Sequence, residues 1–493
     1  FVVASCGLAY ELIAGALSSY LLGDSVLQFS SIIGCYLFAM GVGSHLSKYV
    51  RDEDALARFI DIELLVGIVG GVSATLLFLL FAWMSAPFRT VLYALVFALG
   101  VLVGMEIPLV MRVLHNRQAQ FSELVSRVLT FDYLGALVVS LLFPLVLAPK
   151  LGLSRTGFLF GMANAAVALW TLWHYRAEVP GARGRFTRGV LAMAFLAIGL
   201  AASEHLTRWA ERGLFGDEVI YATTTPYQRI VVTRWKDDTR LHINGNLQFS
   251  SRDEHRYHEA LVHPALATMP WARRVLVLGG GDGLAVREIL RYPHIEHITL
   301  VDLDPAMTDL FTRNAYLAEL NGGALSDPRV TVINADAGQW LDENAGVFDL
   351  IVADFPDPSN FGLGKLYSVP IYRLMAKHLS ANGALVVQST SPWFAPKSFW
   401  CIDATLREAG FVTQPYHAYV PSFGEWGFNL ATRRPGFVPP ESYPVPTRFL
   451  DADTTRAMFR FPPDMRPPAV EPNHLNSQTL VHYFEQDWRN VVR

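Results

Sequence analysis

The fold of the second half of the chain is decided by residues 274–283, which read RVLVLGGGDG. A continuous apolar stretch, 274–278, runs into a glycine-rich turn, and a predicted helix follows at 284–290. This order is typical of the first unit of a doubly wound nucleotide-binding sheet, where glycines let the backbone turn tightly and approach a ligand. A glycine-rich turn alone is a weak signal, because it also occurs where no ligand binds.

Downstream of this turn, apolar strands and helices alternate, as a doubly wound sheet requires. The next predicted strand, 297–301, ends at Asp302, and an acid at this place can accept hydrogen bonds from ribose hydroxyls. Further strands are predicted at 330–333, 348–353 and 384–388. The sequence therefore predicts an α/β Rossmann-like domain of the methyltransferase type, which we place at 251–434.

Acidic residues follow these strands, and ligands of doubly wound sheets bind at the carboxyl ends of the strands. Asp336 follows one strand, and Asp354 and Asp357 follow the next, three positions apart. Two carboxylates in one cleft suit a polycationic amine, because one can accept a proton from an attacking nitrogen while the other holds positive charge. A methyltransferase acting on a neutral substrate needs no such pair.

Upstream, residues 206–250 predict a small antiparallel β-hairpin domain, since Asn244-Gly245 between two short strands is a strong hairpin signal. The helix predicted at 253–268 carries Tyr257 and His258, which either contact the same amine or lie on a plain surface face. From 435 to 493 the chain is rich in proline, so we expect an extended, wrapping tail that ends in a short helix near 476–488.

The first 205 residues differ in composition from the rest. The chain is 52% hydrophobic and 17% charged with a mean hydropathy of +0.27, which is too apolar for an ordinary soluble enzyme. A membrane span needs about 20 apolar residues. Seven candidate spans lie at about 1–21, 26–47, 60–83, 90–112, 127–148, 155–175 and 188–204. We therefore predict an α-helical transmembrane domain over 1–205 and a multi-pass protein of the cell membrane.

Four acidic residues fall within or at the edges of these spans: Glu11, Glu63, Glu106 and Asp132. A charge at mid-bilayer costs a few kcal/mol or more, so such side chains usually face the bundle interior or a cavity. Pro108 shortly after Glu106 opens backbone groups nearby. One interpretation is a path or polar cavity for a cationic amine, and the other is that the acids are neutral or paired and only pack the bundle.

Charge and cysteine usage exclude other classes. The net charge of −4 and the pI of about 6.4 give no nucleic-acid footprint. The three cysteines, Cys6, Cys35 and Cys401, are scattered and indicate neither a disulfide framework nor a metal cluster.

Taken together, the motifs resemble those of the polyamine aminopropyltransferases of the spermidine synthase type, and the apolar first half resembles the membrane-embedded, multi-pass branch of that family. The resemblance covers about 220–430 and rests on motifs in the family's order. These are Tyr227-Gln228, Asp253-Glu254, Tyr257-His258-Glu259, the 279–283 turn, Asp302-Leu303-Asp304, Asp336-Ala337, the 354–358 loop and the 424–428 segment.

The resemblance implies decarboxylated S-adenosylmethionine as co-substrate, putrescine as the default acceptor, methylthioadenosine as product, no permanently bound cofactor, no metal, and a homo-oligomer, by default a dimer. For the donor it implies contacts from Gln228, Asp302, Asp336, Ala337, Gly279 and Gly281. For the amine it implies contacts from His258, Asp282, Asp357 and Trp426. The proton acceptor would be Asp354, assisted by Tyr257.

The chain departs from the family pattern at several places. Asp302 stands where Glu is usual, and Asn244 stands where Asp is usual. Leu284 replaces a frequent glycine, Phe355-Pro356 replaces small hydroxyl residues, the 360–365 loop lacks a proline, and Phe423 stands in a shortened segment that normally holds a tyrosine. We expect an intact donor site and an altered acceptor pocket.

Two alternatives stay open. One is a methyltransferase that uses intact S-adenosylmethionine, although the glycine turn has no basic residue for the donor's carboxylate. The other is an amine transporter or sensor whose synthase-like domain has lost its chemistry.

The side of the membrane also stays open. Loops after predicted spans two, four and six hold Lys48, Arg51, Arg58, Arg112, Arg117, Arg127, Arg176, Arg183, Arg185 and Arg188, whereas the other loops hold only Arg89, Lys150 and Arg155. The positive-inside rule puts the first set in the cytoplasm. An odd number of spans then puts the α/β domain outside, whereas its co-substrate is made inside cells.

Overall fold

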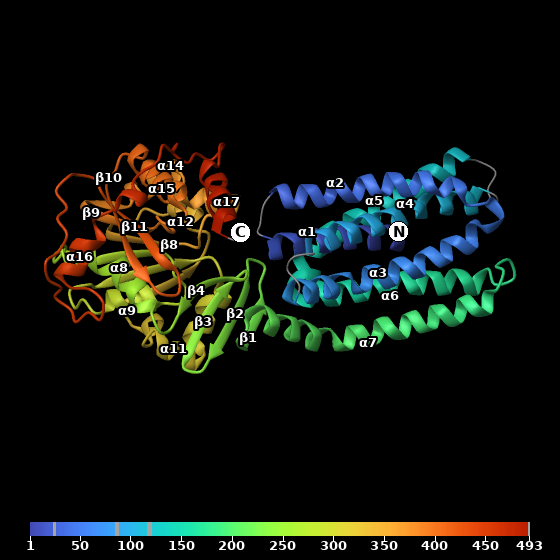
Figure 1. Ribbon diagram of the computed structural model, residues 1–493, viewed down its shortest axis with the longest axis horizontal. Coiled ribbons are helices and arrows are strands. Elements are labelled where there is room, and N and C mark those ends of the chain that lie inside the picture. The colour runs from blue at the N-terminus through green and yellow to red at the C-terminus, as the bar shows by residue number, and fades with distance from the viewer. Residues whose placement is uncertain (23–25, 84–87, 116–120, 492–493) are drawn as a thin grey trace. The chain divides into compact units, whose positions relative to one another are not determined.

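The computed structural model describes residues 1–22, 26–83, 88–115 and 121–491. The chain forms two compact units, Phe1–Pro226 and Tyr227–Arg493, which we call the helical unit and the α/β unit (Figure 1). Each is described here by itself. The finer division into four segments at 205, 250 and 434 stays a prediction.

The helical unit contains a long helix at each of the seven predicted positions. They are α1 (Val2–Leu22), α2 (Val26–Leu46), α3 (Ala55–Trp83), α4 (Phe88–His115), α5 (Phe121–Leu142), α6 (Gly152–His174) and α7 (Ala182–Phe215), with π-helical η3 (Phe143–Leu151) between α5 and α6. By length and apolar composition the described residues contain 6 candidate spans, because α5, η3 and α6 fall in one stretch, Ser122–His174. Arg117, used in the charge count above, lies outside the described residues.

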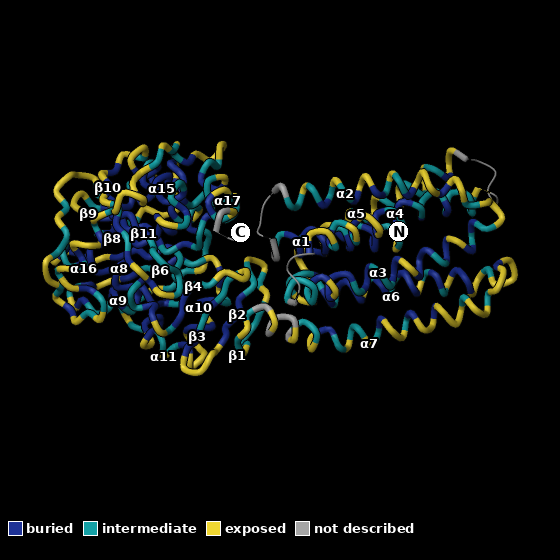
Figure 2. Tube along the Cα trace, viewed as in Figure 1, coloured by how far each residue is buried: buried dark blue, intermediate teal, exposed yellow. Residues whose placement is uncertain are grey.

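Small residues let these helices pack closely. A Cβ on Gly67 of α3 would lie 2.8 Å from the carbonyl oxygen of Gly161 on α6. A Cβ on Gly104 of α4 would lie 2.1 Å from the carbonyl oxygen of Met40 on α2. Helices associate in this way where apolar driving forces between them are weak, as in lipid. On the outside of the unit, buried and exposed residues alternate along α2 and α7 (Figure 2).

The α/β unit is built on a seven-stranded sheet of order β10-β11-β9-β8-β5-β6-β7. The strands are β5 (Arg274–Gly279), β6 (His297–Asp302), β7 (Val330–Asn334), β8 (Phe348–Asp354), β9 (Leu379–Gln388), β10 (Val412–Val420) and β11 (Gly424–Thr432). Strands β5 to β9 are parallel, whereas β11 is antiparallel to both β9 and β10. The prediction of a Rossmann-type α/β domain is confirmed, although β10 and β11 were not predicted.

Helices connect and cover these strands (Figure 1). They are α8 (Glu254–Leu266), α9 (Leu284–Leu290), α10 (Pro305–Arg313), α11 (Ala315–Leu320), α12 (Ala337–Glu343), α13 (Phe361–Gly364), α14 (Val369–Lys377), α15 (Pro396–Glu408), α16 (Ala452–Met458) and α17 (Thr479–Val491). Their apolar faces and the sheet strands form a common core with Leu278, Ile351 and Leu385 fully buried.

The order of the strands reverses between β5 and β8. The chain proceeds outward through β6 and β7, then returns to pair β8 with the other side of β5. In this pairing Gly279 stands opposite Asp354 at the carboxyl ends of both strands. Ligands of doubly wound sheets bind outside such a reversal, so the fold places the glycine turn and Asp354 at the expected binding edge.

Strands β2 (Arg229–Trp235), β3 (Asp238–Ile243) and β4 (Asn246–Ser250) form an antiparallel ladder. Asn244 has φ 51° and Gly245 has φ 84°, as a two-residue hairpin turn of type I′ requires. The hairpin prediction is therefore confirmed. Strand β1 (Glu218–Thr224) belongs to the helical unit.

The proline-rich tail is held against the α/β unit by polar contacts. The carboxylate of Glu259 on α8 accepts hydrogen bonds from the backbone N–H groups of Arg448, Phe449 and Leu450 at 2.8, 2.9 and 3.3 Å. The Asn473 amide donates to the carbonyl oxygens of Gly364 and Tyr367. The terminal helix predicted near 476–488 is α17, whereas α16 was not predicted.

Candidate active site

Asp354 is the last residue of β8 and lies at the binding edge of the sheet. The apolar residues before it are fully buried, and Asp354 itself is half-buried where the strand ends. Oδ1 of Asp354 accepts a hydrogen bond from the Tyr257 hydroxyl at 2.5 Å. Burial raises the pKa of Asp354 to about 6, although the charge of His258 and the hydrogen bond from Tyr257 act in the opposite direction. A carboxyl group of this pKa can exchange a proton near neutral pH.

Tyr257 and His258 reach this carboxyl group from α8. The Tyr257 ring packs against Phe428 and Phe423, with centroid separations of 5.3 and 6.1 Å. Nδ1 of His258 lies 2.8 Å from Oε2 of Glu254. Burial lowers the pKa of His258, but the hydrogen bond and charge of Glu254 outweigh it and raise the pKa overall. The α8 helix therefore presents a phenol and an imidazole that favours its charged form beside Asp354.

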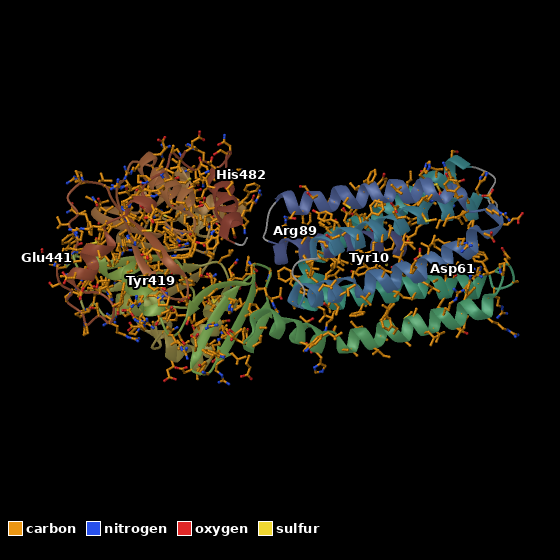
Figure 3. The ribbon with its side chains drawn as sticks, in the orientation of Figure 1. Tyr10, Asp61, Arg89, Tyr419, Glu441 and His482 are labelled. Atoms are coloured by element: carbon orange, nitrogen blue, oxygen red, sulfur yellow. The ribbon has the colours of Figure 1, made fainter. Side chains whose placement is uncertain are left out.

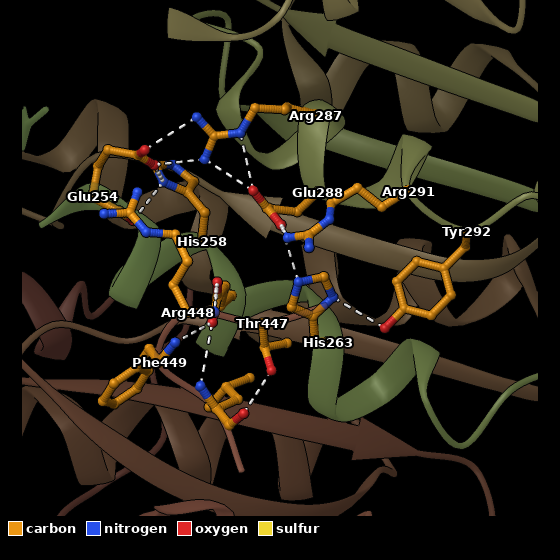
Figure 4. Close-up of polar contacts among 12 residues, drawn as sticks. Glu254, His258, His263, Arg287, Glu288, Arg291, Tyr292, Thr447, Arg448 and Phe449 are labelled. Carbon is orange, nitrogen blue, oxygen red and sulfur yellow. Dashed lines mark hydrogen bonds and ion pairs between the residues drawn. The ribbon is translucent and has the colours of Figure 1, made fainter. Parts of the chain in front are cut away.

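A buried ion-pair network supports His258 from behind (Figure 4). The Arg287 guanidinium donates to both carboxylate oxygens of Glu254, at 3.0 and 2.9 Å. It also donates to Glu288, which contacts Arg291 and Nε2 of His263. Burial raises the pKa of Glu254. The hydrogen bonds and charges of His258 and Arg287 outweigh the effect of burial and lower this pKa to about 2. Glu254 thus stays ionised and holds His258.

The glycine turn and the end of β6 form a second part of the site. The Gly281 backbone N–H donates to Oδ2 of Asp302 at 3.0 Å, and that of Asp304 donates to Oδ1 at 2.9 Å. Burial raises the pKa of Asp302 to about 6. A Cβ on Gly281 would lie 2.7 Å from Cγ of Asp302. Only glycine allows this approach, which leaves the Asp302 carboxyl group at the turn.

Asp282 completes this turn. Its Oδ1 accepts the Leu284 backbone N–H at 2.9 Å, and its carbonyl oxygen accepts from the Asn321 amide at 2.8 Å. Burial raises the pKa of Asp282, whereas the charge of His258 lowers it. The carboxyl groups of Asp282 and Asp354 are close enough for their charges to interact. Two acids and one imidazole therefore meet where β5 and β8 end.

Asp357 lies in a third part of the site, which is organised by a residue that sequence reasoning missed. Gln388 ends β9, and its Nε2 lies 3.4 Å from Oδ1 of Asp357 and 2.6 Å from the Tyr367 hydroxyl. Its Oε1 accepts from Nε1 of Trp426 at 3.3 Å. Burial raises the pKa of Asp357 to about 7. Gln388 thereby joins the two predicted amine contacts, Asp357 and Trp426, and its place at a strand end was a signal available in the sequence.

Thr390 was also missed. Its backbone N–H donates to Oε1 of Gln388 at 3.0 Å, and its hydroxyl lies 3.5 Å from Oδ2 of Asp357. Its φ is 55°, in the left-handed region that β-branched residues rarely adopt. Strain of this kind clusters at functional sites, where surrounding contacts hold it in place. No sequence signal marks this conformation.

The predicted adenine contact, Asp336, caps α12 next to β7. Its Oδ1 accepts the Gln339 N–H at 3.0 Å, and its Oδ2 accepts from Nζ of Lys365 at 2.7 Å. Burial raises the pKa of Asp336. The contact with Lys365 and the backbone hydrogen bonds outweigh the effect of burial, so the pKa is lowered overall. Ala337 begins α12 and is buried. Gln228 lies just before β2 and is half-buried, and its role toward the donor stays a prediction.

The edge of the sheet is suited to a cationic, nucleoside-bearing ligand. Four half-buried carboxyl groups, those of Asp282, Asp302, Asp354 and Asp357, have pKa values above their ordinary range. Burial without counter-charge is unfavourable for ionised carboxylates, and a bound cation offsets that cost. Among the described residues, no group of three or more His, Cys, Asp or Glu side chains has an arrangement that could hold a metal ion.

Comparison with known proteins identifies the family of the chain. Residues 254–437 match the family model described as spermine/spermidine synthase domain. The chain is 70% identical to polyamine aminopropyltransferase 2 of Ralstonia nicotianae over 499 residues, which covers 100% of this chain and 98% of the relative. It is 49% identical to polyamine aminopropyltransferase of Leptospira interrogans over 491 residues, covering 100% and 98%.

Among solved structures, half of the chain is similar to a spermidine synthase crystallised in complex with the transition-state analogue AdoDATO. The identity is 23%, the TM-score is 0.47, and the match covers 50% of this chain and 86% of the other. The full-length relatives show the family: the chain belongs to the polyamine aminopropyltransferases, so it is a transferase enzyme.

Proposed function

We propose that this aminopropyltransferase transfers the aminopropyl group of decarboxylated S-adenosylmethionine to an amine, by default putrescine, with Asp354 as the proton acceptor. The chain, as a member of its family, transfers an aminopropyl group and releases methylthioadenosine. The observation that carries the assignment is the partly buried Tyr257–Asp354 hydrogen bond, which lies at the strand end where Asp354 pairs with Gly279 and the strand order reverses.

The reaction is a direct displacement. The amine nitrogen attacks the methylene carbon beside the sulfonium, the new C–N bond forms as the C–S bond breaks, and methylthioadenosine leaves. The nitrogen loses its proton to Asp354, whose pKa of about 6 lets it accept that proton near neutral pH. The sulfonium already activates the carbon, so the protein supplies alignment and a neutral nucleophile.

Donor and acceptor would occupy opposite parts of the edge. For the donor, Asp302 would hold the ribose hydroxyls beside the Gly279 and Gly281 turn, Asp336 and the backbone of Ala337 would hold adenine, and Gln228 would contact the sulfur side. For the amine, Asp357 and Asp282 would hold ammonium charge, Trp426 would line its path, and His258 would contact it through the nitrogen that faces away from Glu254.

The enzyme test uses the full-length chain in detergent with decarboxylated S-adenosylmethionine and a panel of amines. We expect release of methylthioadenosine with putrescine or a related diamine. Folded protein that releases none with any amine would overturn the proposal. Intact S-adenosylmethionine supplied in parallel tests the methyltransferase alternative, for which methylated amine is the diagnostic product.

We also infer that the helical unit is a multi-pass domain of the cell membrane. Large apolar side chains are exposed on its outer helices, among them Leu137 (55%), Leu191 (63%) and Ile198 (69%). Exposed apolar side chains in such number are typical of contact with an apolar partner, and we take that partner to be lipid. Retention of the chain in membranes after alkaline extraction tests this placement, and thiol labelling of a tagged C-terminus in intact cells tests the side.

A homo-dimer is the default oligomer. Size-exclusion chromatography with light scattering of the detergent-solubilised chain tests it, and a monomeric mass would count against it.

A further inference from the structure

Within the helical unit, three buried polar side chains from three helices form a hydrogen-bonded chain. The Tyr10 hydroxyl on α1 donates to Oδ1 of Asn164 on α6 at 3.0 Å. Nδ2 of Asn164 then donates to Oε2 of Glu63 on α3 at 2.7 Å. Tyr10 is drawn among the helices in Figure 3 and is 1% exposed, and Asn164 and Glu63 are fully buried. The hydrogen-bonded chain therefore ends on a carboxyl group.

A second carboxyl group lies near the end of that chain. Glu106 on α4 is 2% exposed, and its charge interacts with that of Glu63. Oε1 of Glu63 and Oε1 of Glu106 both have no hydrogen-bond partner among the residues that the structure describes. A buried polar atom without a partner is unfavourable, and more so when the group is charged. Two such atoms from different helices indicate that a donor is missing.

Local sequence features create this place. Gly70 on α3 faces Tyr10, and a Cβ there would lie 2.5 Å from Cζ of the Tyr10 ring. Glycine therefore lets the ring reach Asn164. Pro108 on α4 cannot donate a backbone hydrogen bond to the preceding turn, which contains Glu106. Of the four acids expected in the spans, Glu11 and Asp132 are only half-buried.

We propose that Glu63 and Glu106 bind an organic ammonium group inside the helical unit, at a site separate from the catalytic edge. An ammonium group carries three N–H donors and a positive charge, which matches the unpartnered carboxyl oxygens and the nearby Tyr10 oxygen. An anion would be repelled by the two acids. A divalent metal finds no group of three or more metal-ligating side chains among the described residues.

Amines are the chemical class that the α/β unit uses and produces. A cell that supplies the amine substrate of the enzyme therefore also supplies an ammonium ligand for the helical unit. The ligand class therefore rests on the proposed function, whereas the site consists of helical-unit residues alone. The two are tested by different readouts, amine binding for this site and methylthioadenosine release for the catalytic edge.

The test is equilibrium dialysis of labelled putrescine, and separately spermidine, against the full-length chain in lipid nanodiscs. We expect two bound amines per wild-type chain and one in the Glu63→Gln/Glu106→Gln double variant, with methylthioadenosine release unchanged. Glu11→Gln is the matched control and keeps both. Equal stoichiometry in wild type and double variant would overturn the proposal.

Glu106→Gln alone covers the case in which the double variant does not fold. Oε1 of Glu106 makes no hydrogen bond among the described residues that the amide would break, and the amide has nearly the shape of the carboxyl group, so the single variant should unfold close to the wild-type temperature. We expect its amine affinity at the second site to fall at least tenfold. Unchanged affinity in this folded variant would refute the site even if the double variant were lost.

Discussion

Both units contain carboxyl groups that are at least partly buried, but the hydrogen-bond partners of these groups differ. In the α/β unit, Asp302 receives two backbone N–H groups and Asp354 receives the Tyr257 hydroxyl. In the helical unit, Glu63 and Glu106 each keep an oxygen without a partner in the described residues. Strand ends and tight turns carry free backbone donors, whereas helix interiors have none to offer. The acids at the sheet edge are therefore held in place by donors of the protein itself. The two acids in the helical bundle need a hydrogen-bond donor from a bound ligand.

The largest expected effect is a loss of turnover on substitution of an acid at the sheet edge, which substitution of an acid in the helical unit should not cause. Asp354→Asn removes the proton acceptor but keeps the side-chain shape, so kcat should fall by about 10²–10⁴. Methylthioadenosine release measures this, and calorimetry should show product affinity within about threefold of wild type. The exposed Asp342→Asn is the matched control in the same unit, and Glu106→Gln is the control in the other. Unchanged turnover in Asp354→Asn would remove this residue from the acceptor role.

The second effect concerns the ion pair that distinguishes the α/β unit. Arg287→Met leaves Glu254 buried without its bidentate partner, which should lower the free energy of unfolding by about 3 kcal/mol. The pKa of Glu254, about 2 against 4.5, is depressed, so this stabilisation is present above pH 4.5 and is lost as pH falls toward 2. Urea unfolding at pH 7 measures the loss.

Arg287→Lys keeps the charge without the paired geometry and should recover only part of that stability. Loss of Arg287 leaves Glu254 paired with His258, so the protonation of His258, and with it the pH profile of turnover, should also change in Arg287→Met. A profile identical to wild type would show that Arg287 has a structural role alone.

The sequence predicted the centre of the fold because its signals are local. The apolar run before Gly279, the glycines and the Asn244-Gly245 turn each act within a few residues. Strands β10 and β11 were not predicted, because their local sequence signals are misleading. Pro415 interrupts β10 and glycines interrupt β11, and such residues argue against a strand by sequence pattern. The pairing of β10 at the edge of the sheet allows its proline.

The site was predictable in one respect and not in another. Acids at strand ends were found by their place, and the same rule would have found Gln388. The partners of these groups were not predictable, because Arg287 and Lys365 meet their acids across about thirty residues or more of chain. Thr390 in the left-handed region is fixed by its hydrogen bonds to neighbours rather than by its own preference.

The third effect tests the amine part of the sheet edge. Asp357→Asn keeps the contacts with Gln388 in shape but removes the negative charge. A hydrogen bond to a charged group is worth about 1.5–3 kcal/mol, so KM for the amine should rise about 10–100-fold while KM for the nucleoside donor stays within about twofold. A rise in the KM for the nucleoside donor alone would show that Asp357 contacts the donor and not the amine.

The fourth effect is the pH dependence that follows from burial. Asp354 is protonated below its pKa of about 6 and then cannot accept a proton, so kcat/KM should fall about tenfold per pH unit below that value. Tyr257→Phe removes a hydrogen bond that lowers the pKa of Asp354, so the acid limb should move to higher pH. An acid limb near pH 4 in the wild type, unmoved in Tyr257→Phe, would contradict the assignment.

The smallest effect concerns a carboxylate whose partner is partly exposed. Lys365 and Asp336 are 42% and 30% exposed, and pairs of this kind contribute about 0–1 kcal/mol. Lys365→Met frees Oδ2 of Asp336 for an adenine amino group, so methylthioadenosine should bind up to about fivefold more tightly. The exposed Lys377→Met is the matched control and should leave affinity unchanged. Weaker binding in Lys365→Met would instead mean that Lys365 itself contacts the nucleoside, and that Asp336 serves to hold the lysine.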